Sequence, residues 1–435
     1  MVNDEAIMKE ISSTLIDLYN KNFAGEVYSK IKLNVANWFG VAIGSLSFRE
    51  SVPFINIARK EKGDFKVIGG LKSTPYLSTL VNTSLAHLLD FDDTHLKTIL
   101  HPGTPVIASA LTSVQFGMGK FLNAIALGEE MAIRLGLAMD ISNNSKWHYT
   151  GALGGISSSI TSSLLLKLSE EEMVNAISLS SAFASGFEKG FGTHAKAYGV
   201  GRAAAEGIIS SLSAKDGIKA TPKFLRVFAE TVGKGIDFNT LIEGLGRKWH
   251  LLDNVEKPYA CGVVLHPVIE ASSKFKEGNY SPSSIREIVV KVNPKVMELC
   301  GNLNPKSGLE AKFSVNHAVV LGVIFGKADP SEFSEEVVNN EDIVKLRGKV
   351  KVSVDEGLKR GDAEVTFKLI DNEEVKFEVK HGEERASKMP SEEDIKRKFS
   401  RLTFKVIGEE RAESLWKAIM SCEREKGVED ILDLI

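Results

Sequence analysis

The segment AEVTFKLIDNEEVKFEVK, Ala363 to Lys380, decides the fold class of this 435-residue chain. Apolar and polar residues alternate along both of its halves, which is the pattern of strands with one buried face. The triplet Asp371-Asn372-Glu373 separates the halves and predicts the turn of a β-hairpin. We therefore expect a sheet in a chain whose other long segments are mainly helical.

Two upstream segments alternate in the same way and are strand candidates: Ile285–Val292 (IREIVVKV) and Lys349–Asp355 (KVKVSVD). An apolar helix is expected between them over 309–326, and a second helix around 334–346. This mixture over residues 258–390 predicts a compact α+β domain.

The rest of the chain has the pattern of helices. Apolar residues recur at three- and four-residue spacing over 5–19, 27–44, 75–91, 105–117, 121–140, 151–168, 170–184 and 200–214. Phe65–Gly70 is at most one short strand, and helices return over 391–402 and 408–423. We predict a mainly α fold: a large all-helical domain of residues 1–257 with 391–435, and a smaller α+β domain of residues 258–390 inserted before the C-terminal helices. The Gly, Ala and Ser residues of 151–168 indicate a crowded helical core.

Composition excludes several function classes. The chain is 43% hydrophobic and 26% charged, and a net charge of -3 gives no electrostatic reason to bind nucleic acid or an anionic membrane. Its three cysteines, Cys261, Cys300 and Cys422, form no CxxC pair, which fits a reducing compartment. The N-terminus has no apolar signal region, and no apolar stretch is long enough to span a bilayer. We expect a cytoplasmic protein.

The richest polar cluster lies in LAHLLDFDDTHLKTILHPGTPVIASALT, Leu85 to Thr112, which holds three of the nine histidines. It could be a metal site, a metal-free acid–base site or a polar connection between helices capped by Asp and Thr. The spacing matches neither HExxH nor an EF-hand loop, which disfavours a metal. An acid–base site needs a carboxylate beside an imidazole, and Asp90 or Asp93 with His101 would provide it.

Three further motifs contain candidate residues. His148 precedes a small-residue helix whose first residues, Thr150 and Gly151, suit a carboxylate ligand, although a capping Thr in an aromatic cluster is the structural alternative. KGFGTHAKAYGVGRAAAEG contains His194, Lys196 and Arg202 among glycines, which indicates an anion pocket or a surface loop. Lys257-Pro258 stands where the pattern changes. His266 and His317 lie on apolar helices, where core packing is the default.

The order of these motifs is more specific than any one of them. From the N-terminus they read Asp90-Phe91-Asp92-Asp93-Thr94-His95 with His101-Pro102-Gly103, His148-x-Thr150-Gly151, Gly192-Thr193-x-x-Lys196 with Gly201-Arg202-Ala203-Ala204, Lys257-Pro258-Tyr259-x-Cys261-Gly262 and Lys312-Phe313-Ser314. This series resembles the MmgE/PrpD family, which includes 2-methylcitrate dehydratase, cis-aconitate decarboxylase and an iminodisuccinate epimerase. The resemblance implies the two-domain architecture above, a homodimer, and chemistry without a cofactor or metal.

The resemblance also implies roles for individual residues. The residues expected to be catalytic are Asp90, His101, His148, Lys196 and Lys257. Of the residues expected to bind substrate, Thr94 matches the family's acidic motif. The others are candidates from their places in this chain's motifs: His95, Thr150, His194, Arg202 and His317. The two lysines would hold substrate carboxylates, the histidines His101 and His148 would act as acid and base in an order that the sequence leaves open, and Asp90 would orient one of them.

Two departures from the family pattern affect the pocket wall. Many members read GTxTKPLHxGRAA, and this chain reads GTHAKAYGVGRAA, so that Gly199 replaces a histidine and Ala197 a proline. His317 stands where decarboxylase-like members have a tyrosine. The expected reaction is dehydration of 2-methylcitrate to 2-methylaconitate, by proton removal beside a carboxylate. The alternatives are a cis-aconitate-type decarboxylase, an iminodisuccinate-type epimerase and a non-catalytic carboxylate-binding dimer.

Overall fold

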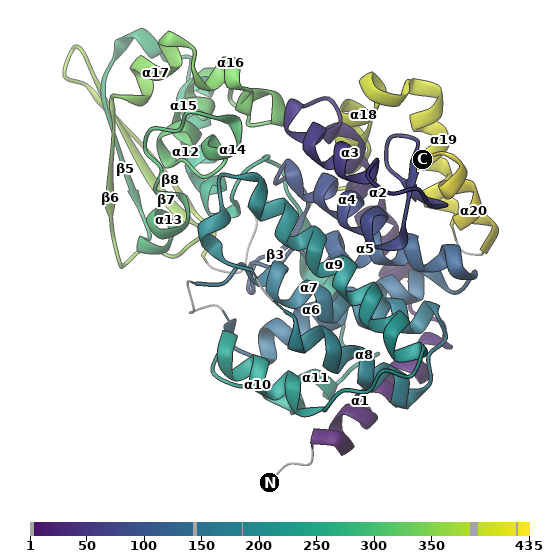
Figure 1. The fold of residues 1–435 in the computed structure, drawn as a ribbon. Coiled ribbons are helices and arrows are strands. Elements are labelled where there is room, and N and C mark those ends of the chain that lie inside the picture. The colour runs from purple at the N-terminus through teal and green to yellow at the C-terminus, as the bar shows by residue number, and fades with distance from the viewer. Residues whose placement is uncertain (1–3, 142–145, 185, 383–389, 423–424) are drawn as a thin grey trace.

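The computed structural model describes residues 4–141, 146–184, 186–382, 390–422 and 425–435. The predicted mainly α fold is confirmed. A sheet-containing part, green in Figure 1, lies beside a larger helical part and is followed in the chain by the yellow C-terminal helices, which pack against the helical part. Within the described ranges, no helix has both the length and the apolar character needed to cross a bilayer.

The helices of the larger part match the predicted segments closely. They are α1 (Asp4–Tyr19), α2 (Gly25–Ser45), α3 (Val52–Ala58), α4 (Pro75–Leu88), α5 (Gly103–Ser113), α6 (Phe121–Ala138), α7 (Tyr149–Leu165), α8 (Glu170–Ala182), α9 (His194–Lys215), α10 (Lys223–Val232) and α11 (Phe238–Ile242). The short α3, α10 and α11 were not predicted. Helix α9 begins six residues before the predicted start because the Thr193 side chain caps the N–H of Ala195.

The expected crowding of helices around α7 and α9 is confirmed. A Cβ atom on Gly207 of α9 would lie 2.5 Å from the Gly155 carbonyl oxygen of α7. A Cβ atom on Gly201 would lie 2.4 Å from the carbonyl oxygen of Leu80 in α4. Only glycine permits these close approaches, which let α9 pack tightly against both α7 and α4.

The expectation of an all-helical larger part is wrong in one respect, because two short antiparallel ladders interrupt it. Strand β1 (Phe65–Val67) pairs with β2 (Leu71–Ser73), and β3 (Asp93–His95) pairs with β4 (Asn254–Glu256). Strands of three residues are too short to show a periodic pattern. The second ladder places the acidic motif directly beside the segment that leads into Lys257.

The sheet-containing part has the predicted strands and hairpin. Its four strands, in the order β6-β5-β7-β8, are β5 (Ile285–Val292), β6 (Val350–Val354), β7 (Asp362–Leu369) and β8 (Glu374–Lys380). Strands β5 and β6 are parallel, and the other pairs are antiparallel. The helices are α12 (His266–Glu277), α13 (Pro294–Cys300), α14 (Gly308–Ala311), α15 (Val315–Phe325), α16 (Glu335–Val338) and α17 (Glu341–Arg347). The single helix expected over 309–326 is two helices, because Ser314 caps α15 anew.

The C-terminal helices return to the larger part, as expected. They are α18 (Glu392–Ile407), α19 (Glu409–Ser421) and α20 (Glu425–Asp433), and α20 was not predicted. Residue 423, the end of a predicted helix, lies outside the described residues, as do residues 1–3 of the N-terminal segment. Phe399 of α18 packs on Gly40 of α2, where a Cβ would lie 3.3 Å from the Phe399 Cα. This packing brings Lys398, the preceding residue, to the acidic motif.

Candidate active site

The predicted catalytic residues converge on one cavity of about 390 Å³. The cavity lies where β3, the segment after β4 and the N-termini of α5, α7 and α9 meet. Its wall is formed by Asp90, Ile99, His101, His148, Phe191, Lys196, Lys257, Gly262, Val263, Val264, Leu299, Cys300 and Phe313. The first part of the chain thus supplies most of the polar groups, and residues 262–264, 299–300 and 313 supply an apolar wall.

Asp90 is the central carboxylate, and it pairs with the two predicted lysines. Its Oδ1 accepts hydrogen bonds from Lys257 Nζ at 2.7 Å and from Lys196 Nζ at 3.1 Å. Burial acts to raise the pKa of Asp90, but the two ammonium groups outweigh it and hold the pKa well below its usual value. The structure therefore differs from the expectation that Asp90 orients a histidine: its partners are Lys196 and Lys257.

His87, in the last turn of α4, belongs to the same cluster and was not singled out in the sequence. Its Nδ1–H donates to Asp92 Oδ2 at 2.6 Å, and its Nε2 accepts from Lys196 Nζ at 2.8 Å. Its ring stacks on that of His148 with centroids 5.4 Å apart. Burial lowers the pKa of His87 despite the nearby carboxylate of Asp92. The Lys196 ammonium group is therefore held both by Asp90 and by the pair of Asp92 and His87.

The tautomer of His101 is fixed by its neighbours. Its Nδ1 lies 2.7 Å from the Asp93 carbonyl oxygen, which can only accept, so Nδ1 carries the proton and Nε2 the lone pair. Thr94 Oγ1 lies 3.1 Å from the same Nδ1, and Thr150 Oγ1 accepts from the His101 backbone N–H. Burial lowers the pKa of His101 well below its usual value, although Asp92 opposes this. His101 is thus a neutral imidazole with a basic nitrogen.

His148 is the second imidazole of the cavity wall and sits at the N-cap of α7. Its Nε2 is buried and has no hydrogen-bond partner among the described residues. Burial, and then the charge of Lys196, lower its pKa well below the usual value. His148 is therefore neutral as well, and its unpartnered nitrogen is available to a ligand.

Two more buried lysines hold the backbone on both sides of Asp90: Lys312, which belongs to the last of the family motifs but was given no role, and Lys398, which was not predicted. Lys312 Nζ donates to the carbonyl oxygens of Leu89 and Ala260, at 2.8 Å each. Lys398 Nζ donates to the carbonyl oxygens of Phe91 at 2.6 Å and Lys257 at 2.9 Å. Burial lowers the pKa of Lys312 to about 8 and that of Lys398 to about 7.

These lysine bridges explain the backbone of Asp90. Asp90 has a φ of 50°, in the left-handed region that non-glycine residues rarely adopt. Such a conformation costs on the order of 1 kcal/mol or more and persists only where the surroundings enforce it. The bridges from Lys312 and Lys398 fix the carbonyl groups on either side of Asp90 and tie them to the segment that carries Lys257.

The predicted substrate-binding residues divide into two groups. Thr94 and Thr150 contact His101 but, like the other four, do not line the reactive cavity. The His95 ring is hydrogen-bonded to Thr98 Oγ1, and the His194 ring lies 3.0 Å from the Glu50 carbonyl oxygen. Arg202 is exposed beside Glu206. His317 is buried near the Glu332 carbonyl group and Arg347.

The histidines also have the spacing of a metal site. Ligand atoms of His87, His101 and His148 lie within 4.8 Å of one another, and so do those of Asp90, Asp92 and His101. However, both nitrogens of His87 are engaged, one of them with the ammonium group of Lys196. A metal ion bound there would face that positive charge, so the donor set fits a resident metal poorly. Metal-free chemistry remains a prediction.

Comparison with known proteins gives one consistent family. The MmgE/PrpD N-terminal domain matches residues 9–233, and the MmgE/PrpD C-terminal domain matches residues 259–424. A cis-aconitate decarboxylase of Aspergillus terreus is 25% identical over 414 residues, covering 86% of this chain and 84% of that protein. The cis-aconitate decarboxylase-like protein oryM of Aspergillus oryzae is 24% identical over 481 residues, covering 99% of this chain and 97% of that protein.

Proposed function

Because the chain belongs to the MmgE/PrpD family, we propose that it is a cofactor-independent lyase that removes a proton beside a carboxylate of a small di- or tricarboxylate. The leading reaction is dehydration of 2-methylcitrate to 2-methylaconitate. The observation that carries the proposal is the pair of neutral imidazoles, His101 and His148, in a cavity where Lys196 and Lys257 share the single carboxylate of Asp90.

The charge of the cavity favours an anionic ligand. Lys196 and Lys257 line it and share one carboxylate, that of Asp90. Two buried ammonium groups beside a single carboxylate are costly unless a further anion compensates them. A substrate carboxylate beside Lys196 and Lys257 would supply that compensation. The same lysines would stabilise the negative charge that develops on this carboxylate as the adjacent C–H bond breaks.

The tautomer of His101 favours one division of labour between the two histidines. His101 Nε2 carries a lone pair and takes the proton from the carbon beside the bound carboxylate. Asp92, whose Oδ1 lies 3.5 Å from His101 Nδ1, stabilises the imidazolium. The electron pair of the C–H bond forms the new double bond as the β-hydroxyl group leaves. The carboxylates of the bound substrate raise the proton affinity of His148, and the imidazolium then donates its Nε2 proton to this hydroxyl group, which departs as water while His148 returns to the neutral form.

Decarboxylation of a cis-aconitate-type substrate is the second candidate, favoured by the names of the curated relatives. In that reaction a carboxylate leaves as carbon dioxide, and a histidine protonates the resulting carbanion. The stacked rings of Phe191 and Phe313, 5.0 Å apart, give the cavity an apolar wall that would favour loss of a neutral molecule. Epimerisation would use the same proton removal with return of the proton to the opposite face.

Proton NMR in D₂O tests the proposal, with 2-methylcitrate, citrate and cis-aconitate in separate tubes. Conversion of the methyl doublet of 2-methylcitrate into a methyl singlet is expected, because the double bond of 2-methylaconitate carries no proton. New vinyl signals with carbon dioxide from cis-aconitate would identify the decarboxylase instead. His101→Gln and His148→Gln should each lower turnover by roughly 10²–10⁴-fold. His250→Gln, a histidine outside the cavity, is the matched control. Tight binding without turnover of any substrate would identify a carboxylate-binding protein.

We also propose a cytoplasmic homodimer, as the family resemblance implies. Light scattering on the purified protein tests the oligomeric state: a mass near 95 kDa is expected, about twice the 47.5 kDa of one chain. A mass that stays at one chain over a wide concentration range would refute the dimer.

A further inference from the structure

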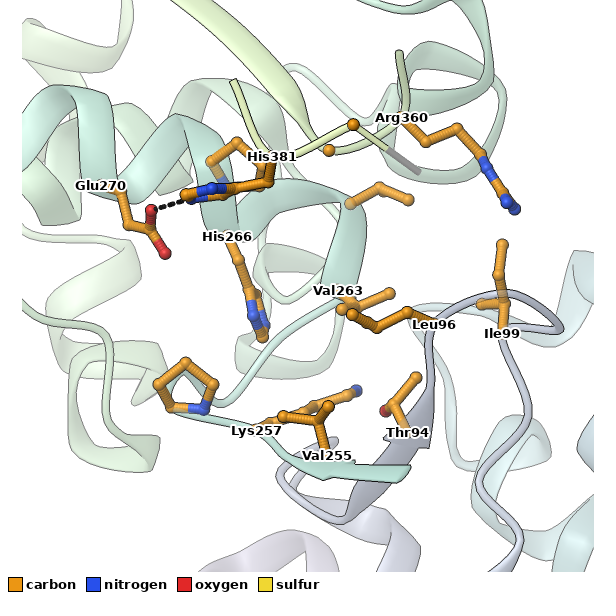
Figure 2. A pocket seen from close by; sticks show the side chains of 15 residues that line it. Thr94, Leu96, Ile99, Val255, Lys257, Val263, His266, Glu270, Arg360 and His381 are labelled. Carbon is orange, nitrogen blue, oxygen red and sulfur yellow. Dashed lines mark hydrogen bonds and ion pairs between the residues drawn. The ribbon is translucent and has the colours of Figure 1, made fainter. Parts of the chain in front are cut away.

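A second and larger cavity adjoins the reactive one and has no part in the proposed chemistry. Its space, part of which is open to solvent, amounts to about 630 Å³, against about 390 Å³ for the reactive cavity by the same measure. The two cavities share four wall residues, Ile99, Lys257, Val263 and Val264. Figure 2 shows the larger cavity, with Thr94, Val255 and Lys257 on one side and Arg360 and His381 across the open space.

Most of the larger cavity is aliphatic. Besides the shared residues, its wall includes Leu96, Val255, Pro258 and Pro267. Apolar surface of this kind gains free energy when a ligand replaces the water in contact with it. A compact tricarboxylate held by Lys196 and Lys257 would leave this surface bare.

Two polar groups of the larger cavity have no partner. Arg360 Nη1 and His266 Nε2 are buried and lack a hydrogen-bond partner in the part of the chain that the structure describes. Two other polar residues of this cavity are paired with each other, because His381 Nε2 lies 2.6 Å from Glu270 Oε2. Since buried polar groups without a partner are rare in proteins, Arg360 and His266 each point to a ligand atom or an ordered water in this cavity. The guanidinium group favours an acceptor oxygen, above all a carboxylate.

We propose that the larger cavity receives an apolar chain of several carbons carried by the substrate. This proposal rests on the proposed function: the polycarboxylate head lies among Lys196, Lys257 and the two histidines, and the chain passes the shared residues Ile99, Val263 and Val264. Arg360 then binds an acceptor oxygen at the far end of the chain. The substrate is thus a long-chain analogue of 2-methylcitrate, and Leu96, Val255 and Arg360 determine its specificity.

A homologous series of alkylcitrates tests the inference, with methyl, ethyl, butyl and hexyl substituents and a butyl chain that ends in a carboxylate. Both the dissociation constant, by calorimetry, and kcat/KM, by NMR, are measured for each. In the wild type, affinity and kcat/KM should rise roughly threefold to fourfold per added methylene group. The terminal carboxylate should add at least a further tenfold, which Arg360→Gln should remove.

Leu96→Trp is the decisive variant, because Leu96 lines the larger cavity and not the reactive one. It should abolish the dependence on chain length and change kcat/KM for 2-methylcitrate by less than twofold. Val354→Trp is the matched control, because it introduces the same indole group at a surface position where the native valine is 57% exposed.

Three results would overturn the inference or separate it from the proposed function. Flat or falling affinity along the series in the wild type would refute a chain-binding cavity. Equal slowing of all substrates by Leu96→Trp would show that the larger cavity is only a path by which substrate reaches the reactive cavity. Length-dependent binding that Leu96→Trp abolishes, without turnover of any member, would support the cavity and refute the lyase.

Discussion

Replacing Asp93 by Asn should stabilise the protein, and by an amount that depends on pH. The Asp93 carboxylate is fully buried, and burial followed by the charge of Asp92 raises its pKa to about 6. Its Oδ2 accepts hydrogen bonds from the Gly103 N–H at 2.8 Å and from Asn254 Nδ2 at 2.7 Å. An asparagine carbonyl oxygen can accept the same two bonds without carrying the charge.

The sign and size of the effect follow from the difference in proton affinity. The usual pKa of an aspartate is 3.8, so between pH 3.8 and about 6 the folded protein binds a proton that the unfolded chain has lost. Stability therefore falls as pH rises through this window, and the loss is complete above about pH 6. The full difference of about two pKa units corresponds to about 3 kcal/mol at pH 8 and roughly half of that at pH 5.

Urea denaturation at pH 5 and pH 8 measures this effect. Asp93→Asn should raise the free energy of unfolding by up to about 3 kcal/mol at pH 8, and by roughly half as much at pH 5, with an unchanged urea dependence. Asp355→Asn is the matched control, since Asp355 also accepts a backbone N–H bond, from Gly357. Equal stability of Asp93→Asn and wild type at both pH values would refute the claim that burial of this carboxylate is costly.

Three other predictions follow from the site. Lys398→Met should lower kcat/KM by about 10- to 100-fold, more through kcat than KM, because the carbonyl groups of Phe91 and Lys257 lose their shared donor. Lys396→Met, on the same helix, is the control and should have no such effect. Unchanged kinetics of Lys398→Met would refute the role of the bridge. The acid limb of the pH–kcat/KM profile should lie below pH 6.5, the usual pKa of a histidine. Burial lowers the pKa of His101, and His101 stops acting as a base only when it is protonated. A limb at or above pH 6.5 would exclude His101 as the base. Turnover should survive prolonged EDTA treatment, and loss with recovery on adding Zn²⁺ or Mg²⁺ would refute metal-free chemistry.

The fold was largely predictable because its main elements are long and periodic. The hairpin of β7 and β8 alternates over 18 residues, and α2 or α6 offers four or more turns of apolar spacing. Strands β3 and β4 were missed because three residues contain no period, and their pairing joins positions 93–95 to 254–256. The early start of α9 was missed because its glycines resemble a loop, although the Thr193 cap is a signal that could have located it.

The candidate site was predictable where a local motif exists and not where contacts are long-range. The structure brings the polar side chains of Asp90, His101 and His148 together around one cavity. His87 could have been found, since it lies one helical turn before Asp90 on the apolar helix α4. Lys398 could not, because it is 307 positions from Phe91 and its helix has an ordinary amphipathic sequence.

The two lysine bridges also give a physical reason for the order of the chain. Asp90 can hold its left-handed backbone only if the groups around it are fixed. Lys312 comes from the sheet-containing part and Lys398 from a helix after it, and each joins the 89–91 segment to the 257–260 segment. The central carboxylate therefore reaches its geometry only when the inserted part and the returning helix have both packed. An isolated N-terminal fragment would lack both donors, and we expect it to fold without ordering Asp90 for catalysis.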